Sequence, residues 1–255
     1  MIEAEALAKT FPQASRPWSR QKRALVALQS VSFSAEDGRI TGLLGANGAG
    51  KSTTMRILAT LVHADRGRAR VDGFDVRQQA AKVRQSIAYL PHNSGIYPRL
   101  TTIENIVYYA EISGLHGRLA RLRAQELIEL LDMGDIAGRR TDGFSQGQRT
   151  KVALARAMVH RPKTLILDEP SNGLDVLATR NLRTVLRRLR DEGHCILLSS
   201  HIMQEIAALC DEVAVIHDGI ATRNDSLAGF LARTGTDNLE DAFVTEIGRA
   251  RGVQA

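Results

Sequence analysis

Long apolar runs and cysteines are both scarce in this sequence. No apolar run approaches the ~20 residues that a membrane-spanning helix requires. The first residues contain no basic stretch followed by an apolar core, so the sequence predicts neither a membrane span nor a signal peptide. The two cysteines, Cys195 and Cys210, lie in apolar or helical surroundings. They are expected to be reduced, structural side chains of a cytosolic protein rather than a disulfide or a metal site.

The composition that remains is typical of a globular protein with surplus positive charge. The 255 residues are 44% hydrophobic and 24% charged, enough for one large domain or two small ones. Lys and Arg outnumber Asp and Glu by 34 to 28, which gives a formal net charge of +6. This surplus is compatible with binding to nucleic acid, anionic lipid or nucleotide, and equally with a compositional bias toward arginine.

A glycine-rich stretch matches the phosphate-binding P-loop pattern G-x-x-x-x-G-K-[ST]. Its glycines permit backbone angles that a side chain would forbid, so that successive N–H groups can point at one anion. Residues 39–44 ahead of it read as a buried strand, and the residues after it have helical spacing, which is the context that the motif needs. Lys51 is expected to reach the β- and γ-phosphates, and Ser52 to ligate Mg²⁺. The predicted phosphate-binding residues are Gly45, Asn47, Gly48, Gly50, Lys51, Ser52 and Thr53.

An aromatic residue ahead of such a loop can stack on an adenine ring. Phe11, at the end of the first predicted strand, is the leading candidate, and Trp18 is the second. The plain alternative is that Phe11 packs the end of its strand. Residues 11–23 contain two prolines and a basic run, which predict a surface loop.

Predicted strands and helices alternate along most of the chain. Apolar runs of strand type occur at 86–90, 164–170, 195–199 and 213–216, with helical patterns between them, so the sequence predicts an α/β fold with a mainly parallel sheet. From 101 to about 131 the pattern is helical, and Thr101 to Glu104 is typical of a capping box. We expect a helical insertion, 92–161, within a core of 1–91 and 162–234, followed by a polar, weakly helical tail, 235–255.

A metal-bound nucleotide needs a carboxylate beside the P-loop. Residues 165–168 (LILD) form an apolar strand that ends in an acid, so Asp168 is expected to hold Mg²⁺ together with Ser52. Glu169 follows at once and is placed to polarise a water for attack on the γ-phosphate. An Asp-Glu pair alone would more often be a solvated strand end, and the upstream P-loop is what favours the catalytic interpretation.

Three further motifs resemble those of the ATP-binding subunits of ABC transporters. Residues 144–148 (FSQGQ) are similar to the family signature LSGGQ and open a predicted helix. Residues 171–175 resemble the D-loop, and 199–201 resemble the segment that ends in the switch histidine, here His201. With the P-loop and the Asp-Glu pair, five motifs in the family's order cover nearly the whole chain. The resemblance implies a RecA-like P-loop NTPase core with an antiparallel β subdomain and an inserted α-helical subdomain.

The resemblance also implies that each ATP lies between the P-loop of one domain and the signature motif of another, in a head-to-tail dimer. The chain carries one set of motifs, so a second ATP-binding subunit is expected, most simply a second copy, with the transmembrane permease as a separate chain. The implied catalytic residues are Glu169 and His201. Outside the P-loop, the residues implied to contact the nucleotide are Ser145, Gly147, Gln148 and Asp175.

One position departs from the family pattern. Members usually carry glutamine at the end of the strand 86–90, where it approaches Mg²⁺ and the attacking water, and this sequence has His92 at about that place. A neutral imidazole can accept a hydrogen bond from water or bind a metal, so His92 is expected to be a metal-site residue. Gln146, where the signature commonly has glycine, is a milder departure.

A finer branch of the family is indicated by three segments. Residues 94–105 and 201–211 resemble the NatA-type sodium-efflux ATPases, and 239–243 resemble the closing motif of ABC-2-type exporters. The resemblance implies a subunit that energises such an exporter, with Na⁺ efflux as the finer suggestion, at the cytoplasmic face of the cell membrane. Ser94–Glu104 is the expected docking surface for the permease. The alternatives are a soluble ABC ATPase acting on ribosomes or nucleic acid, and a nucleotide-binding regulator that does not hydrolyse ATP.

Overall fold

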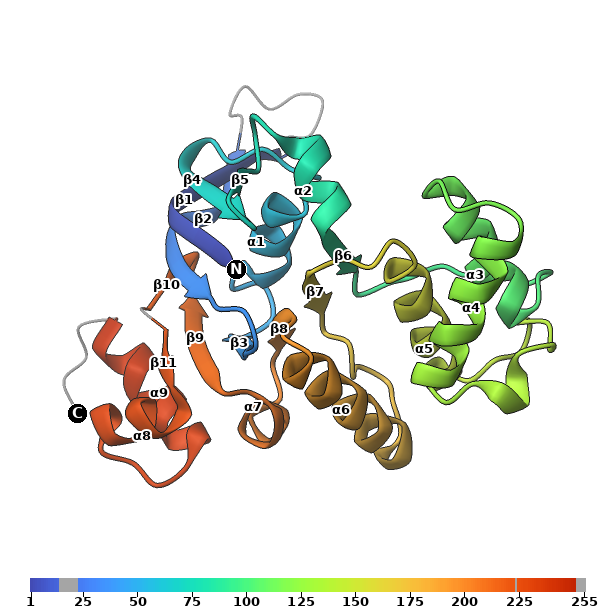
Figure 1. Ribbon diagram of the computed structural model, residues 1–255. Helices are drawn as coiled ribbons and strands as arrows, with labels where there is room; N and C mark the ends of the chain where they lie inside the picture. Colours follow the sequence, from blue (N-terminus) through green and yellow to red (C-terminus); the bar gives the residue numbers. More distant parts are fainter. Residues whose placement is uncertain (14–22, 223, 251–255) are drawn as a thin grey trace.

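A mixed β-sheet runs through the molecule, with helices on both of its sides (Figure 1). The computed structural model describes residues 1–13, 23–222 and 224–250. Within these residues the strand order is β5-β4-β1-β2-β10-β9-β3-β8-β7-β6, and β11 pairs with β9 beside this path. The strands are β1 (Ile2–Gln13), β2 (Arg23–Ala35), β3 (Ile40–Leu44), β4 (Arg66–Val71), β5 (Phe74–Asp75), β6 (Ile87–Leu90), β7 (Thr164–Asp168), β8 (Cys195–Ser200), β9 (Glu212–His217), β10 (Ile220–Ala221) and β11 (Asp225–Ser226).

The parallel half of the sheet brings the sequence motifs to one edge. Strand β3 pairs in parallel with β8 and β9, and β7 pairs in parallel with β6 and β8. Every residue of β3, β7 and β8 is buried, as expected for parallel strands covered on both faces. The P-loop follows β3, the Asp-Glu pair closes β7, and His201 follows β8, so all three meet at the carboxyl ends of neighbouring strands.

The other half of the sheet is antiparallel and confirms the expected β subdomain. Strand β1 pairs antiparallel with β2 and with β4, and β4 forms a hairpin with β5. The turn of that hairpin is Asp72-Gly73, and both residues have positive φ, which fits a tight two-residue connection.

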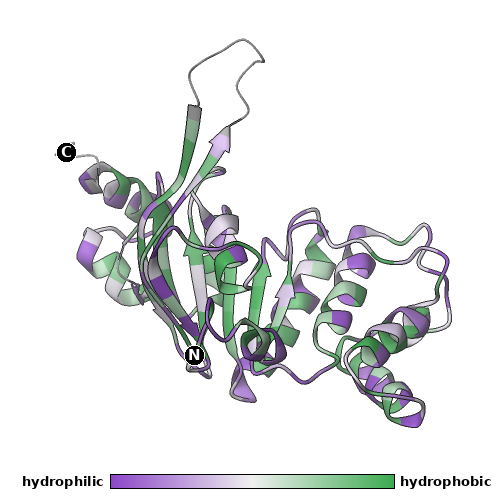
Figure 2. Cartoon of the chain, turned by 90° about the horizontal axis from the view of Figure 1, so that it is seen from above, coloured by the Kyte–Doolittle hydropathy of each residue, from purple (hydrophilic) through white to green (hydrophobic). Residues whose placement is uncertain are grey.

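Two hydrophobic cores lie on opposite faces of the sheet. Along β7, Leu165 and Leu167 belong to the core that also holds buried side chains of the helices after residue 100, whereas Ile166 belongs to the core beneath the helix Lys51–Leu58 and the antiparallel strands. This alternation follows from the two-residue period of a strand. In Figure 2 the central strands are mostly green and the helices mix green with purple. The helices that cover the sheet are α1 (Lys51–Leu58), α2 (Ala80–Ser86), α6 (Val176–Asp191) and α7 (Met203–Leu209).

The inserted helices lie together, apart from the sheet (Figure 1). They are α3 (Thr102–Ile112), α4 (Arg118–Leu130) and α5 (Gln146–Ala157), with a short 3₁₀ turn at Gly134–Ile136. The predicted capping box is confirmed: Glu104 N–H donates to Thr101 Oγ1 at 3.3 Å, and Thr101 N–H donates to Glu104 Oε2 at 2.8 Å. The buried Asn105 amide donates to the carbonyls of Tyr97 and Thr101, which fixes the loop after β6 on this subdomain.

Two helices complete the chain, and the first of them was not predicted from the sequence. Helix α8 (Leu227–Thr234) starts at Ser226, whose hydroxyl accepts the Gly229 N–H at 3.0 Å, and α9 (Leu239–Ala250) follows. Phe230 of α8 and Phe243 of α9 are buried in the same core as Leu165 and Leu167 of β7. Among the described residues, no helix is both long enough and apolar enough to cross a bilayer.

Candidate functional site

The P-loop joins β3 to α1, and two of its glycines lie where a side chain would not fit. A Cβ on Gly45 would lie 2.4 Å from the carbonyl oxygen of Ile216, and a Cβ on Gly50 would lie 2.6 Å from Leu28 Cδ2. Gly48 and Gly50 also have φ of 83° and 114°, in the region that favours glycine. The glycines therefore allow a tight loop against the neighbouring strands, with the N-terminus of α1 directly behind it.

The Lys51 side chain is buried and folds back over the P-loop. Its Nζ donates to the carbonyl oxygen of Gly45 at 2.6 Å and to that of Ala46 at 3.1 Å, and it lies 3.5 Å from Glu169 Oε1. Burial lowers the pKa of Lys51, and the nearby Glu169 carboxylate opposes that shift. An ammonium group held in this way has the charge and the position to pair with a phosphate.

Asp168 closes β7 and is buried with one carboxylate oxygen unpaired. Its Oδ1 accepts hydrogen bonds from Ser52 Oγ at 3.1 Å and from Ser199 Oγ at 2.8 Å. Its Oδ2 is buried and has no hydrogen-bond partner among the residues that the structure describes. An unsatisfied buried carboxylate oxygen costs about 1–3 kcal/mol or more. Such an atom is an open ligand position for a metal or a water.

These residues fit a bound magnesium ion. Mg²⁺ prefers oxygen ligands and usually takes only one or two from the protein, the rest coming from water and phosphate. Ser52 Oγ and Asp168 Oδ2 are oxygen atoms of the right kind beside the P-loop. The part of the chain that the structure describes has no cluster of three or more His, Cys, Asp or Glu able to hold a metal, and an ion shared with a nucleotide does not need one.

Glu169 lies at the centre of the site in an uncommon backbone conformation. Its φ is 51°, in the left-handed region, and its N–H donates to Ser199 Oγ at 2.9 Å. Oε1, which faces Lys51, also lies 3.1 Å from His201 Nδ1, at ion-pair distance but without hydrogen-bond geometry. An uncommon backbone held by a specific contact is a frequent feature of catalytic residues.

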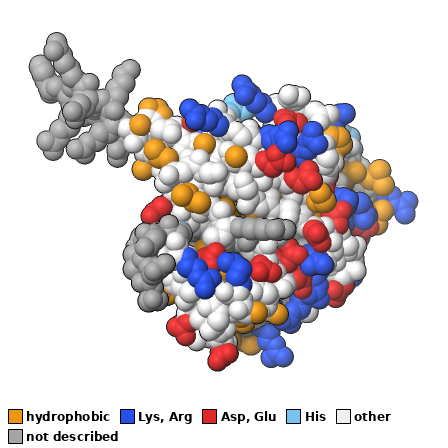
Figure 3. All heavy atoms as spheres, turned by 90° about the vertical axis from the view of Figure 1, so that its left-hand side faces the viewer, with side chains coloured by type: hydrophobic (Ala, Val, Ile, Leu, Met, Phe, Trp, Pro, Cys, Tyr) orange, Lys and Arg blue, Asp and Glu red, His pale blue; other side chains and the backbone are white. Residues whose placement is uncertain are grey.

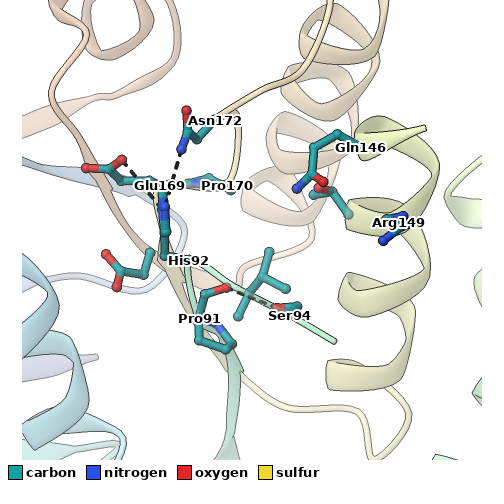
Figure 4. A pocket seen from close by; sticks show the side chains of 11 residues that line it. Pro91, His92, Ser94, Gln146, Arg149, Glu169, Pro170 and Asn172 are labelled. Carbon is teal, nitrogen blue, oxygen red and sulfur yellow. Dashed lines mark hydrogen bonds and ion pairs between the residues drawn. The ribbon is translucent and has the colours of Figure 1, made fainter. Parts of the chain in front are cut away.

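His92 reaches the same carboxylate from the loop after β6. Its Nδ1 lies 3.6 Å from Glu169 Oε2, and its Nε2 lies 3.4 Å from Asn172 Nδ2 (Figure 4). Gln146 and Arg149 of α5 line the same small pocket from the other side. Among the described residues, the polar contacts of His92 are therefore with Glu169 and Asn172, and a role as metal ligand stays a prediction.

An open pocket of about 690 Å³ lies beside the P-loop and has an apolar wall. Phe11, Leu25 and Val26 form that wall, and Phe11 lies opposite Leu25 across the β1–β2 pair. Hydrophobic side chains gather at this end of the two strands, next to the grey residues in Figure 3. The wall suits a flat aromatic base whose phosphates would reach Lys51. Trp18 lies outside the described residues.

The signature residues lie outside the P-loop pocket. The Ser145 hydroxyl accepts the Gln148 N–H at 3.3 Å, and Gln148 Oε1 accepts the Ser145 N–H at 3.1 Å, which is a capping box at the start of α5. A Cβ on Gly147 would lie 2.9 Å from Ala178 Cβ, so α5 packs closely on α6. Asp175 accepts the Ala178 N–H at 2.8 Å and caps α6. A single chain does not bring these residues to the P-loop.

Comparison with known proteins places the chain in a family. The pattern of the family described as ABC transporter matches residues 28–172. The chain belongs to the ABC transporter family. It is therefore an ATP-binding cassette, and the proteins of this family are ATPases. The ABC transporter ATP-binding protein NatA of Bacillus subtilis is 37% identical over 241 residues, which are 94% of this chain and 98% of NatA. The linearmycin resistance ATP-binding protein LnrL of the same organism is 31% identical over 98% of this chain and 77% of its own length.

Solved structures agree with this family fold. A structure of an ATP-binding subunit of an ABC transporter is 27% identical and has a TM-score of 0.79, over 95% of this chain and 98% of that one. A dimeric ATP-binding cassette in a post-hydrolysis state, bound to ADP and Pi, is 22% identical and has a TM-score of 0.77, over 89% of this chain and 99% of that one. The expected P-loop core with an inserted helical subdomain is thereby confirmed.

The structure gathers some of the predicted residues and adds others. The P-loop, Asp168, Glu169, His201, His92 and Phe11 surround one region. Of the signature, Gln146 borders this region beside His92, whereas Ser145, Gly147, Gln148 and Asp175 line neither of its two pockets. Ser199 was missed as a site residue, although it bonds both Asp168 and the Glu169 backbone. Its position at the end of a predicted buried strand was the available signal. Leu25 and Val26 were also missed, because their place beside Phe11 depends on the register of β1 with β2, for which the sequence carries no short-range signal.

Proposed function

We propose that the P-loop pocket binds ATP with Mg²⁺ and that Glu169 is the general base for hydrolysis of the γ-phosphate. The observation that carries this proposal is the convergence on Glu169 of Lys51 at 3.5 Å and His201 at 3.1 Å, beside the unpaired Asp168 Oδ2. A cation, a base and an open metal-ligand position within one site are the parts that phosphoryl transfer to water requires.

Each residue then has a definite task. Lys51 and the P-loop N–H groups bind the β- and γ-phosphates, and Ser52 with Asp168 holds the magnesium ion. The bound ion would neutralise charge that builds on the phosphate oxygens. Glu169 accepts the proton of the attacking water, and His201 donates to the γ-phosphate. Ser199 fixes the orientation of both acids.

The signature residues act on the nucleotide of a second subunit. In one chain, Ser145 and Gln148 bond to each other and contribute nothing to the P-loop pocket. The N-terminus of α5 can bind phosphate through its free N–H groups and its dipole once another P-loop is placed against it. We therefore infer a head-to-tail homodimer, an arrangement in line with the dimeric cassette to which this chain is similar.

We further propose that the dimer energises an exporter. The relative NatA is an ABC transporter ATP-binding protein and LnrL is a linearmycin resistance ATP-binding protein, which favours a role in transport. Na⁺ efflux is the finer proposal, and it rests on the resemblance of residues 94–105 and 201–211 to the NatA-type sodium-efflux ATPases. The permease would be a separate chain, docked near Ser94–Glu104 with the cassette at the cytoplasmic face of the membrane. The loop there is anchored to the helical subdomain by Asn105, which gives a partner a firm surface.

The experiment that tests the nucleotide site is Lys51→Ala. Loss of the ammonium removes the central phosphate contact, so the Kd for ATP should rise at least tenfold, as expected for the loss of a charge-assisted contact in a buried site. Isothermal titration of the purified full chain with Mg-ATP measures it, and Lys151→Ala on the outer part of α5 is the matched control. Unchanged ATP affinity in Lys51→Ala would overturn the assignment.

A further inference from the structure

Helices α7, α8 and α9 enclose an apolar groove away from the P-loop. The groove has a volume of about 980 Å³ and is open to solvent. Its floor consists of Met203, Leu227 and Leu231, which pack on the core beneath but stay partly exposed, and of the buried Leu239. A row of apolar side chains in contact with water is stabilised when a partner covers it.

The rim of the groove is acidic in a chain whose net charge is +6. Asp237, Glu240 and Asp241 are all exposed, and no salt bridge involves them within the described residues. Glu240 accepts a hydrogen bond from the neutral amide of Gln204, and Asp241 accepts from the neutral amide of Asn238. The first-turn position of Glu240 and Asp241 in α9 stabilises that helix, but it explains neither Asp237 nor the apolar floor.

We propose that this groove binds a basic amphipathic helix from a cytoplasmic segment of the membrane-spanning subunit, a partner that rests on the proposed function. Such a helix would lay its apolar face on the leucines and pair its lysines or arginines with the rim. Cytoplasmic segments next to membrane spans are rich in Lys and Arg, which complements the three rim carboxylates, none of which forms an ion pair among the described residues. A symmetric contact with a second copy is disfavoured because it would bring the same carboxylates together.

The groove is also close in sequence to the catalytic site. Helix α7 begins at Met203, two residues after His201, and Met203 forms part of the groove floor. The side chain of Glu205 on the same helix accepts hydrogen bonds from Ser200 at 3.1 Å and from Ser171. An occupant of the groove therefore rests on the helix that is hydrogen-bonded to the loops around Glu169.

A model peptide tests the chemistry of the groove. The probe is an 18-residue amphipathic helix of Leu and Lys, titrated at low salt against the full chain, with a scrambled peptide of the same composition as its control. The double variant Asp237→Lys with Glu240→Lys should weaken binding about tenfold or more, because two attractive charges become repulsive. The matched variant Glu111→Lys with Glu129→Lys makes the same change of net charge on α3 and α4 and should alter binding less than twofold.

The apolar floor gives a second, independent variant. Leu227→Gln should weaken peptide binding several-fold, and circular dichroism and thermal unfolding confirm that the variant is folded. Equal loss in the two charge-reversed variants, or equal binding of the scrambled peptide, would overturn the proposal.

The source of the helix is tested in native membranes. A photo-crosslinking amino acid at the exposed position of Ala207 should capture a Lys- and Arg-rich segment next to a transmembrane helix, identified by mass spectrometry. Capture of a soluble protein or of a second copy of this chain would contradict the proposal. ATP hydrolysis by the same preparations separates the two hypotheses: hydrolysis without groove binding refutes the groove alone, and groove binding without hydrolysis refutes the proposed function alone.

Discussion

The P-loop half of the nucleotide site and its signature half differ in how their polar groups are satisfied. Around the P-loop, Lys51, Glu169 and Asp168 are buried or nearly so, and within the described part of the chain Asp168 Oδ2 has no hydrogen-bond partner. At the signature, Ser145 and Gln148 satisfy each other in a capping box and lie at the surface. The first half leaves a buried carboxylate oxygen free to bind a metal or a water, whereas the second is complete as a helix end. This difference explains how one chain can be stable while it carries two halves of different sites.

Glu169→Gln should give the largest effect, because it removes the proposed general base from the P-loop half of the site. The amide keeps the shape of the side chain but cannot accept a proton, so ATP turnover should fall by about 10²–10⁴-fold, the usual contribution of a general base. ATP binding should persist, and a nucleotide-bound dimer should accumulate on size-exclusion chromatography. Glu129→Gln on the exposed face of α4 is the control. Turnover at the normal rate in Glu169→Gln would rule out this residue as the base.

Ser145→Ala removes the hydroxyl that caps α5 in the signature half of the site. Loss of the cap should cost about 1 kcal/mol of stability, and loss of the phosphate contact in the dimer should lower turnover about tenfold. The affinity of the isolated chain for ATP should stay unchanged, since Ser145 does not line the P-loop pocket. Ser226→Ala removes the matching cap of α8, outside the site. If both variants lose turnover equally in a steady-state assay, stability alone explains the loss.

Phe11→Ala should have a smaller effect, confined to the base of the nucleotide. Stacking of a base on an aromatic side chain contributes about 1–3 kcal/mol, so the Kd for ATP should rise at least fivefold. Tripolyphosphate has the phosphates of ATP but no base, so a titration with it measures the phosphate contacts alone. The affinity of Phe11→Ala for tripolyphosphate should not change. An equal loss of affinity for both ligands would mean that Phe11 only supports the strand end.

Much of the P-loop half could be predicted from the sequence because its motifs are local. The spacing of Gly45, Gly48 and Gly50 encodes the loop, and an apolar run that ends in Asp168 encodes the strand beside it. Ser199 could not be placed, because its contact with Asp168 depends on the pairing of β7 with β8, 31 positions apart. Strand order is set by the packing of the whole sheet and leaves no short-range signal.

The alternation of strands and helices could be predicted from the sequence. Features that depend on helix caps or on packing between distant residues were harder to predict. The capping box at Thr101 could be predicted because both of its partners lie within four residues of each other. Helix α8 was not predicted, since it is short and depends on a cap at Ser226 and on burial of Phe230 against the core. The wall of Leu25 and Val26 depends on the register of β1 with β2, which sequence alone does not fix.

In the proposed dimer the P-loop of one chain faces the signature of the other chain, and chemical crosslinking can test this arrangement. Asn47→Cys and Gln146→Cys introduce exposed thiols into the two halves, on separate chains that also carry Glu169→Gln. The native thiols are buried, and burial raises the pKa of Cys195 to about 11, so they should stay unreactive. With a short bifunctional maleimide and Mg-ATP, the mixture should give a covalent heterodimer that appears with neither variant alone and not without ATP. A link formed within one chain that carries both cysteines, or no heterodimer with ATP bound, would contradict the claim.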